Sequence, residues 1–214
     1  MYRTRPELKE TAKAAFKSHY WPCVAVIALY AVILGSLSGA TWGAASLIIH
    51  PVLTVGLSAF FLKTVRSENP SIEEFFTIPF SQFTRAFLSV FWANLFTLLW
   101  SMLFVIPGIV KAIAYSLTPF LIYDYPNLGW RESVKISMRI TEGHKMDIFV
   151  LVLSFIGWHL LSALTFGILA IFYVSPYSTA SFALMYEDLK NQALANGIVS
   201  INELDPQEGS YTVY

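Results

Sequence analysis

Long apolar stretches alternate with shorter polar segments along this chain. A helix needs about 20 predominantly apolar residues to cross the hydrocarbon core of a bilayer. The apolar stretches approach or reach that length, and few charges interrupt them. They predict six membrane-spanning helices, at residues 21–37, 42–62, 83–106, 107–123, 146–164 and 168–186.

The turns within successive pairs of these stretches are very short. Only a few residues separate the members of each pair, and two of the turns contain Pro107-Gly108 and Phe166-Gly167, which suit tight reversals. Helices joined by so short a loop pack as antiparallel neighbours. The predicted fold is therefore all-α: a polytopic membrane protein whose six transmembrane helices form three hairpins.

An amphipathic segment precedes each predicted hairpin. Thr4 and Glu7 have the spacing of a helix capping box, as do Ser71 and Glu74. We expect these segments to lie along the cytoplasmic membrane surface, where basic side chains attract anionic lipids. The candidate lipid contacts are Lys9, Lys13, Lys17, Arg131, Lys135, Arg139 and Lys145. The alternative is that these basic side chains form faces exposed to water, with no preference for lipid.

The basic residues predict one orientation. All of them except Lys111 lie in segments that precede or follow a hairpin or, as Arg85 does, at the very start of one, and none lies in the short turns. By the positive-inside rule, both termini are then cytoplasmic. We expect an N-terminal amphipathic helix at residues 1–20, a transmembrane domain at 21–189 and a cytoplasmic tail at 190–214.

Composition supports a membrane protein and narrows its chemistry. The chain is 56% hydrophobic and 13% charged, whereas soluble domains carry about 25% charged residues. Basic and acidic residues balance, so no nucleic-acid partner is expected. A single cysteine, Cys23, cannot form an internal disulfide, and no Cys/His cluster has zinc spacing. We expect no metal and no cofactor.

The second helix of each predicted hairpin contains a proline in its interior. These residues are Pro51, Pro119 and Pro176. Proline removes a backbone hydrogen bond and kinks a helix, and the freed carbonyl then needs another partner within the membrane. Three kinks at similar places suggest a threefold repeat of one helical unit, which is a hypothesis because side-chain identity between the units is low.

A series of short motifs runs through the second half of the chain. They are Ile106-Pro107-Gly108, Tyr115-Ser116, Asp124-Tyr125-Pro126, Gly143-His144-Lys145, Ser154-Phe155, Gly157-Trp158, Leu164-Thr165, Pro176-Tyr177 and Tyr186-Glu187-Asp188-Leu189. Together they resemble the integral membrane proteins of domain-of-unknown-function family 975, over about residues 104–190. One family motif, a Ser-Arg pair, is altered here, because Met138 separates Ser137 from Arg139. The resemblance implies a six-helix bacterial cell-membrane protein without an established activity.

No predicted span carries an acidic residue in its interior, which argues against a carboxylate-based proton or cation relay. The sequence also has no Gly-x-Ser-x-Gly elbow and no P-loop. We therefore expect a protein that is not an enzyme.

The ionisable residues within the spans are Lys111, His50 and His159, and Trp158 belongs to the same predicted layer in the outer half of the bundle. Lys111 lies about four residues, or roughly 6 Å, below an outer turn. It either snorkels to the outer headgroups or faces the bundle and binds an anion. Each histidine is either a ligand-binding group or a neutral imidazole bonded to a backbone carbonyl.

These features favour a non-catalytic membrane protein that binds an anionic amphiphile, a lipid or a membrane-active peptide, in the outer half of the bundle. Lys111, His50, His159 and Trp158 are the candidate ligand-binding residues. One alternative is a solute-binding subunit of a transporter. Another is a structural partner that organises a different membrane protein through the amphipathic segments.

Overall fold

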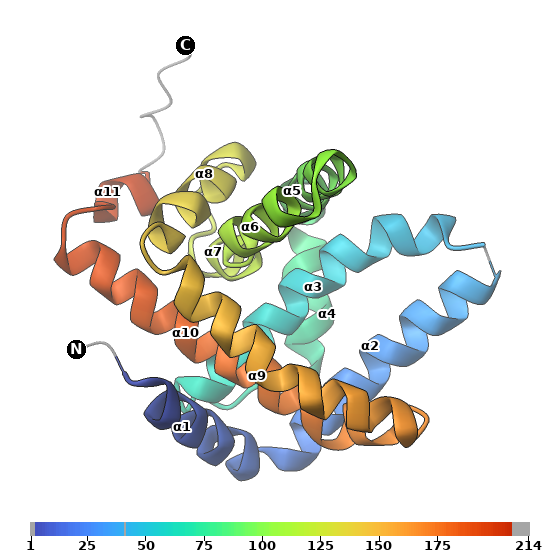
Figure 1. Cartoon of the computed structure of the whole chain (residues 1–214). Coiled ribbons are helices and arrows are strands. Elements are labelled where there is room, and N and C mark those ends of the chain that lie inside the picture. The colour runs from blue at the N-terminus through green and yellow to red at the C-terminus, as the bar shows by residue number, and fades with distance from the viewer. Residues whose placement is uncertain (1–2, 41, 207–214) are drawn as a thin grey trace.

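The computed structural model describes residues 3–40 and 42–206, and all regular secondary structure within these ranges is helical (Figure 1). The helices are α1 (Arg5–Ser18), α2 (Tyr20–Ala40), α3 (Ala44–Val65), α4 (Ile72–Ser81), α5 (Phe83–Leu103), α6 (Val105–Tyr115), α7 (Thr118–Asp124), α8 (Trp130–Thr141), α9 (Lys145–Leu164), the π-helical segment η1 (Ala170–Val174), α10 (Ser175–Ala195) and α11 (Ile201–Leu204). The all-α prediction is confirmed.

Five segments of the described chain are long and apolar enough to cross a membrane. They are Tyr20–Gly39, Ala44–Val65, Phe83–Leu103, Val105–Asp124 and Lys145–Leu164. Each coincides with one of the first five predicted spans. The protein is therefore a multi-pass membrane protein by the length and composition of its helices.

The sixth apolar stretch has a different structure. It is divided between η1 and α10, and α10 continues to Ala195 through the charged residues Glu187, Asp188 and Lys190. Because of this polar second half, α10 is not among the five candidate spans. A sixth crossing, and with it the complete set of three hairpins, stays a prediction.

The fourth span consists of two helices. Pro119 has no backbone N–H, and its ring would clash with the carbonyl four residues earlier, which kinks or breaks an α-helix. Accordingly α6 ends at Tyr115 and α7 begins at Thr118. The two helices leave a short break at Ser116 and Leu117, in the middle of the span.

The turn between α5 and α6 is tighter than the motif at residues 106–108 suggested. Phe104 alone has an extended backbone, and Pro107 and Gly108 already lie in the first turns of α6. A Cβ atom at Gly108 would lie 2.7 Å from the Cα atom of Ser101. Glycine is therefore required here for the close approach of α5 and α6.

Helix α3 occupies the centre of the bundle and packs against α1, α2, α4, α5, α7 and α10. In its most apolar window 56% of the residues are buried, as are 50% in the α6–α7 segment. The windows of α2, α5 and α9 are only 22% buried. These three helices therefore form the periphery, where their exposed apolar side chains would contact lipid.

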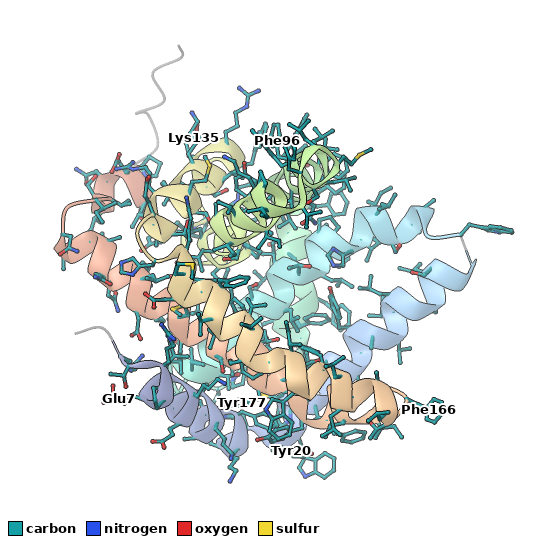
Figure 2. All side chains as sticks on the ribbon, viewed as in Figure 1. Glu7, Tyr20, Phe96, Lys135, Phe166 and Tyr177 are labelled. Atoms are coloured by element: carbon teal, nitrogen blue, oxygen red, sulfur yellow. The ribbon has the colours of Figure 1, made fainter. Side chains whose placement is uncertain are left out.

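The polar segments form helices α1, α4 and α8. Both predicted capping boxes are present: Glu7 accepts a hydrogen bond from the backbone of Thr4 at 2.8 Å, and Glu74 accepts one from Ser71 at 3.4 Å. Figure 1 shows the start of α1 and the whole of α11 at the left of the view, whereas the turns after α2 and α9 lie at the right. Figure 2 places Phe166 at the tip of the second of these turns.

Candidate functional site

Two cavities between the helices share His50 and Asn94 as lining residues. His50 comes from the central helix α3, and Asn94 comes from the middle of α5. We call the first cavity the apolar groove and the second the polar pocket. Because both residues line both cavities, they form the wall at which the two cavities meet.

The apolar groove has a volume of about 510 Å³. Helices α2, α3 and α5 line it, and aliphatic and aromatic side chains make up most of its surface. The lining residues are Leu34, Ser38, Ser46, Leu47, His50, Pro51, Phe91, Asn94, Leu95 and Leu98. Such a surface suits a hydrocarbon chain.

The polar pocket is smaller, with a volume of about 160 Å³. This is far more than the roughly 15 Å³ that one water molecule needs. Besides His50 and Asn94, its lining includes Thr54, Thr97 and Thr118, together with residues of α6. The pocket therefore has room for a small polar group among several hydroxyl, amide and imidazole groups.

Thr118 contributes a hydroxyl without a hydrogen-bond partner. Its side chain is fully buried, and in the described part of the chain nothing bonds to its Oγ1 atom. A buried polar group left without a partner costs about 1–3 kcal/mol. A hydroxyl of this kind in the lining of a pocket is consequently a place where a bound ligand or an ordered water would gain a hydrogen bond.

Local sequence explains how these groups reach the pocket. The break at Pro119 puts Thr118 at the start of α7 rather than inside a continuous helix. On the facing helix, the hydroxyl of Thr54 donates to the carbonyl oxygen of His50 at 2.8 Å. The imidazole of His50 packs against the ring of Tyr30, with 6.2 Å between the ring centroids. Neither the His50 imidazole nor the Asn94 amide has a hydrogen-bond partner among the described residues.

The three polar side chains define the chemistry of the pocket. A neutral imidazole, an amide and a hydroxyl can each donate and accept hydrogen bonds, and none carries a fixed charge. Nothing in this set resembles a nucleophile activated by a base, and among the described residues no three His, Cys, Asp or Glu side chains group as metal ligands. The arrangement suits binding of an uncharged polar group.

Lys111 lies outside the lining of both cavities. Its ammonium is 5.7 Å from the centroid of the Trp100 ring and 5.8 Å from that of Tyr115. Trp100 is 40% exposed on the lipid-facing side of α5. Lys111 is thus held over two aromatic rings, a cation–π arrangement that places its charge near the edge of the bundle rather than inside it.

Trp158 and His159 lie on α9, away from the two cavities. Trp158 is 40% exposed and packs on Tyr173 of η1, with 5.5 Å between the ring centroids. His159 is exposed. Of the four predicted ligand-binding residues, the structure therefore places only His50 on the cavities.

The three prolines have different surroundings. Pro51 lies within the continuous helix α3, where it is buried beside the apolar groove. Pro119 follows the break between α6 and α7 and lines the polar pocket. Pro176 follows η1, at the first turn of α10.

A buried charge cluster, missed by the sequence analysis, joins α3, α7 and α10. Asp124 accepts hydrogen bonds from Arg66 at 2.7 Å, from Lys190 at 2.8 Å and from the Tyr186 hydroxyl at 2.8 Å. Glu187 pairs with the same two cations, Arg66 and Lys190. Burial opposes the charge of Arg66, but its bonds to Asp124 and Glu187 raise the pKa of the guanidinium above its ordinary value.

Two of the sequence motifs meet in this charge cluster. Asp124 begins the motif Asp124-Tyr125-Pro126. Tyr186 and Glu187 belong to the motif Tyr186-Glu187-Asp188-Leu189, in the second half of α10. Each cation is matched by a carboxylate, so the cluster has no charge left for a ligand. Its arrangement indicates a role in holding the helices together.

The seven predicted lipid contacts are not equivalent. Lys13 and Lys17 are exposed on α1, whereas the ammonium of Lys9 lies 4.7 Å above the ring of Phe155. Arg139 binds the carboxylate of Glu203 at 2.9 Å and the carbonyl oxygen of Ile198.

The other three predicted lipid contacts belong to α8 and to the start of α9. Arg131 lies over the ring of Trp130, at 4.9 Å from its centroid. Lys135 and Lys145 take part in no ion pair or hydrogen bond with the described residues.

Two residues of the site were not predicted as ligand-binding groups. They are Asn94 and Thr118, which lie within predicted spans. The signal that could have found Thr118 is its place before Pro119, because proline disturbs the helix at that position.

A family model described as "Protein of unknown function (DUF975)" matches residues 103–193. The match confirms the resemblance that the motifs suggested. It includes α6 to α9, η1 and most of α10, and therefore Thr118 and the acidic part of the charge cluster, but neither His50 nor Asn94. No curated protein and no solved structure matches the chain.

Proposed function

We propose that this protein is a non-catalytic, multi-pass protein of a bacterial cell membrane that binds a lipid-like amphiphile between its helices. The hydrocarbon chain of the amphiphile would lie in the apolar groove, and the headgroup of the amphiphile would enter the polar pocket. The observation that carries this proposal is the buried, unpartnered hydroxyl of Thr118 in a pocket that shares His50 and Asn94 with an apolar groove.

The chemistry of the lining favours an uncharged headgroup. The prediction of an anionic ligand rested on Lys111, whose ammonium lies over Trp100 and Tyr115 instead. His50, Asn94 and Thr118 offer hydrogen bonds without a fixed charge, which matches a hydroxyl or amide headgroup. A membrane-active peptide with an exposed backbone amide presents the same chemistry at larger size.

The orientation follows from the charge pattern. The basic segments precede or follow the hairpins, and this supports cytoplasmic termini. A sixth crossing by η1 and the apolar half of α10 completes three hairpins in this arrangement.

A solute-binding or transporter subunit is the second candidate. Transporters commonly bind substrates where membrane helices are discontinuous. The break between α6 and α7 borders the polar pocket, which is the observation that favours this alternative. A purely structural partner of another membrane protein would need neither cavity.

Binding of a neutral amphiphile can be tested with 1-monooleoylglycerol as the probe. We expect the purified, delipidated protein to bind it in native mass spectrometry. Thr118→Val keeps the shape of the side chain and removes only the hydroxyl, so the affinity should fall about fivefold while thermal stability stays the same or rises. Asn94→Leu should weaken binding in the same direction.

Thr141→Val is the matched control. The hydroxyl of Thr141 is also buried, but it bonds to the carbonyl oxygen of Ser137 at 2.9 Å, in α8. This variant should lose about 1 kcal/mol of stability and bind the probe normally. Unchanged affinity in Thr118→Val would refute the amphiphile site. Co-purification of a water-soluble molecule that competes with the probe would favour the transporter subunit.

A further inference from the structure

A second groove lies on the flank of the bundle, between α5, α6 and α8. It has a volume of about 390 Å³. Trp92 and Phe96 of α5 and Tyr115 of α6 form its inner wall, and α8 contributes Trp130, Arg131 and Lys135. Figure 2 shows Lys135 and Phe96 at the same edge of the molecule, on neighbouring helices. We call this surface the basic aromatic groove.

Helix α8 is anchored against two candidate spans. The ring of Trp130 stacks on that of Trp92, with 6.1 Å between centroids and an interplanar angle of 14°. The hydroxyl of Ser137 donates to the backbone carbonyl of Ala114 in α6 at 2.8 Å. Because α5 and α6 belong to membrane-spanning segments, the outer face of α8 borders the lipid that surrounds them.

The two cations of the groove have no acidic partner among the residues that the structure describes. No Asp or Glu lines the groove, and in the described ranges neither Arg131 nor Lys135 forms an ion pair. Glu132 follows Arg131 on α8 but is not part of the lining. By contrast, Arg139 on the same helix is paired with Glu203. The positive charge of the groove is therefore available to a partner outside the chain.

From this arrangement we infer that the basic aromatic groove binds an anionic phospholipid of the adjacent leaflet. Arg131 and Lys135 contact the phosphate headgroup, and an acyl chain lies against Trp92 and Phe96. Charge complementarity selects the headgroup, since a cationic pair at a membrane surface attracts anionic lipid. The groove shares Tyr115 with the polar pocket but has its own two cations, Arg131 and Lys135. Its ligand needs a negative charge, whereas the ligand proposed for the polar pocket is uncharged.

Titration with lipid tests this inference. We expect dioleoyl phosphatidylglycerol to bind the detergent-solubilised protein more tightly than dioleoyl phosphatidylcholine in native mass spectrometry. The double variant Arg131→Gln, Lys135→Gln should lose about 30-fold in phosphatidylglycerol affinity and little for phosphatidylcholine, at about 1 kcal/mol per basic residue and 1.4 kcal/mol per tenfold change. Both side chains are exposed, so the variant should fold normally.

Three further measurements make the result specific. Arg131→Lys with Lys135→Arg keeps both charges and should retain binding. Phe96→Ala should weaken both lipids, because it removes only apolar contact. The control Lys13→Gln, Lys17→Gln makes the same charge change on α1 and should leave the affinity unchanged.

Each contrary outcome overturns the inference. Normal phosphatidylglycerol affinity in the α8 double variant would show that the groove binds no anionic headgroup. An equal loss in the α1 double variant would show diffuse attraction in place of a site. Competition by glycerol 3-phosphate at equal concentration would identify a free-phosphate site rather than a lipid site.

Discussion

At the scale of single residues, the charge cluster shows how opposite charges are accommodated next to the spans. The side chains of Asp124 and Lys190 are only 8% and 9% exposed. Burying a charge is costly unless it is paired and hydrogen-bonded. Asp124 meets this condition through Arg66, Lys190 and Tyr186, which come from two other helices.

Replacing the central carboxylate should therefore destabilise the protein. In Asp124→Asn, the buried Lys190 and the partly buried Arg66 share the single carboxylate of Glu187, and we expect the free energy of unfolding to fall by about 3 kcal/mol. Thermal unfolding in detergent measures the change. Arg5→Gln is the control, because the Arg5–Asp147 pair is largely exposed, at 50% and 32%, and such pairs contribute about 1 kcal/mol or less. Equal losses in both variants would contradict this account.

Arg85 is a second residue whose role appears only in three dimensions. Its guanidinium donates to the carbonyl oxygens of Tyr125 at 2.8 Å and Leu128 at 2.9 Å, and also to those of Ile122 and Pro126. These acceptors lie in the last turn of α7 and in the loop that follows it. A cation at this position satisfies carbonyl groups that the end of a helix leaves free.

At the scale of elements, the tail contains a short helix that docks on the bundle. Leu204 of α11 and Val199 before it are buried. Arg139 of α8 holds this segment through Glu203 and through the backbone carbonyl of Ile198. The basic face of α8 thus has two uses, since Arg139 binds the tail while Arg131 and Lys135 remain available.

Docking of α11 should depend on pH. The hydrogen bond from Arg139, and then that from the backbone of Ser200, hold the pKa of Glu203 below its ordinary value of 4.5. A lowered carboxyl pKa stabilises the docked form above about pH 4.5, and the contribution is lost as the pH falls through the lowered value.

Amide hydrogen exchange measures this dependence. After correction for intrinsic rates, we expect the Leu204 amide to be protected at about pH 6 and to lose protection at about pH 3. The buried Ala193 in α10 provides the reference amide. Glu203→Gln should lower protection at about pH 6 and remove the dependence. Equal protection of Leu204 at both pH values would show that the ion pair does not hold α11.

At the scale of the whole molecule, the bundle is polar at one end and apolar at its turns. The start of α1 and the whole of α11 lie at the left of the view, while the turns after α2 and α9 lie at the right (Figure 1). Trp42 and Phe166, which lie at these turns, are 100% and 98% exposed. Large aromatic side chains at such positions suit the membrane interface.

Labelling with a membrane-impermeant thiol reagent tests the orientation. Phe166→Cys should react in intact cells, and Glu142→Cys, in the exposed segment between α8 and α9, should react only after permeabilisation. The native Cys23 is fully buried, so the unmodified chain should label poorly and serve as the background. Labelling of both introduced cysteines from the same side would exclude the hairpin α9–α10 as a crossing pair.

Several features could be predicted because their causes are local. The five spans follow from the hydropathy of each helix, and the capping boxes at Thr4 and Ser71 follow from residues three positions apart. A disturbance of the fourth span at Pro119 was expected from the proline ring, but the same ring at Pro51 leaves α3 continuous. His50 was a predicted ligand-binding residue and lines both cavities, whereas Lys111, His159 and Trp158, predicted in the same layer, line neither.

The sequence by itself determined that the chain is a helical, multi-pass membrane protein, because the transfer of an apolar helix into lipid depends on that helix alone. Tertiary structure decided which polar side chains meet. Asp124 and Lys190 lie 66 positions apart, and Thr118 and Asn94 share a pocket across two helices. The basic aromatic groove likewise exists only because α8 packs on α5. Such encounters depend on how helices cross and rotate, which is set by the packing of many side chains and not by the pattern of any one segment.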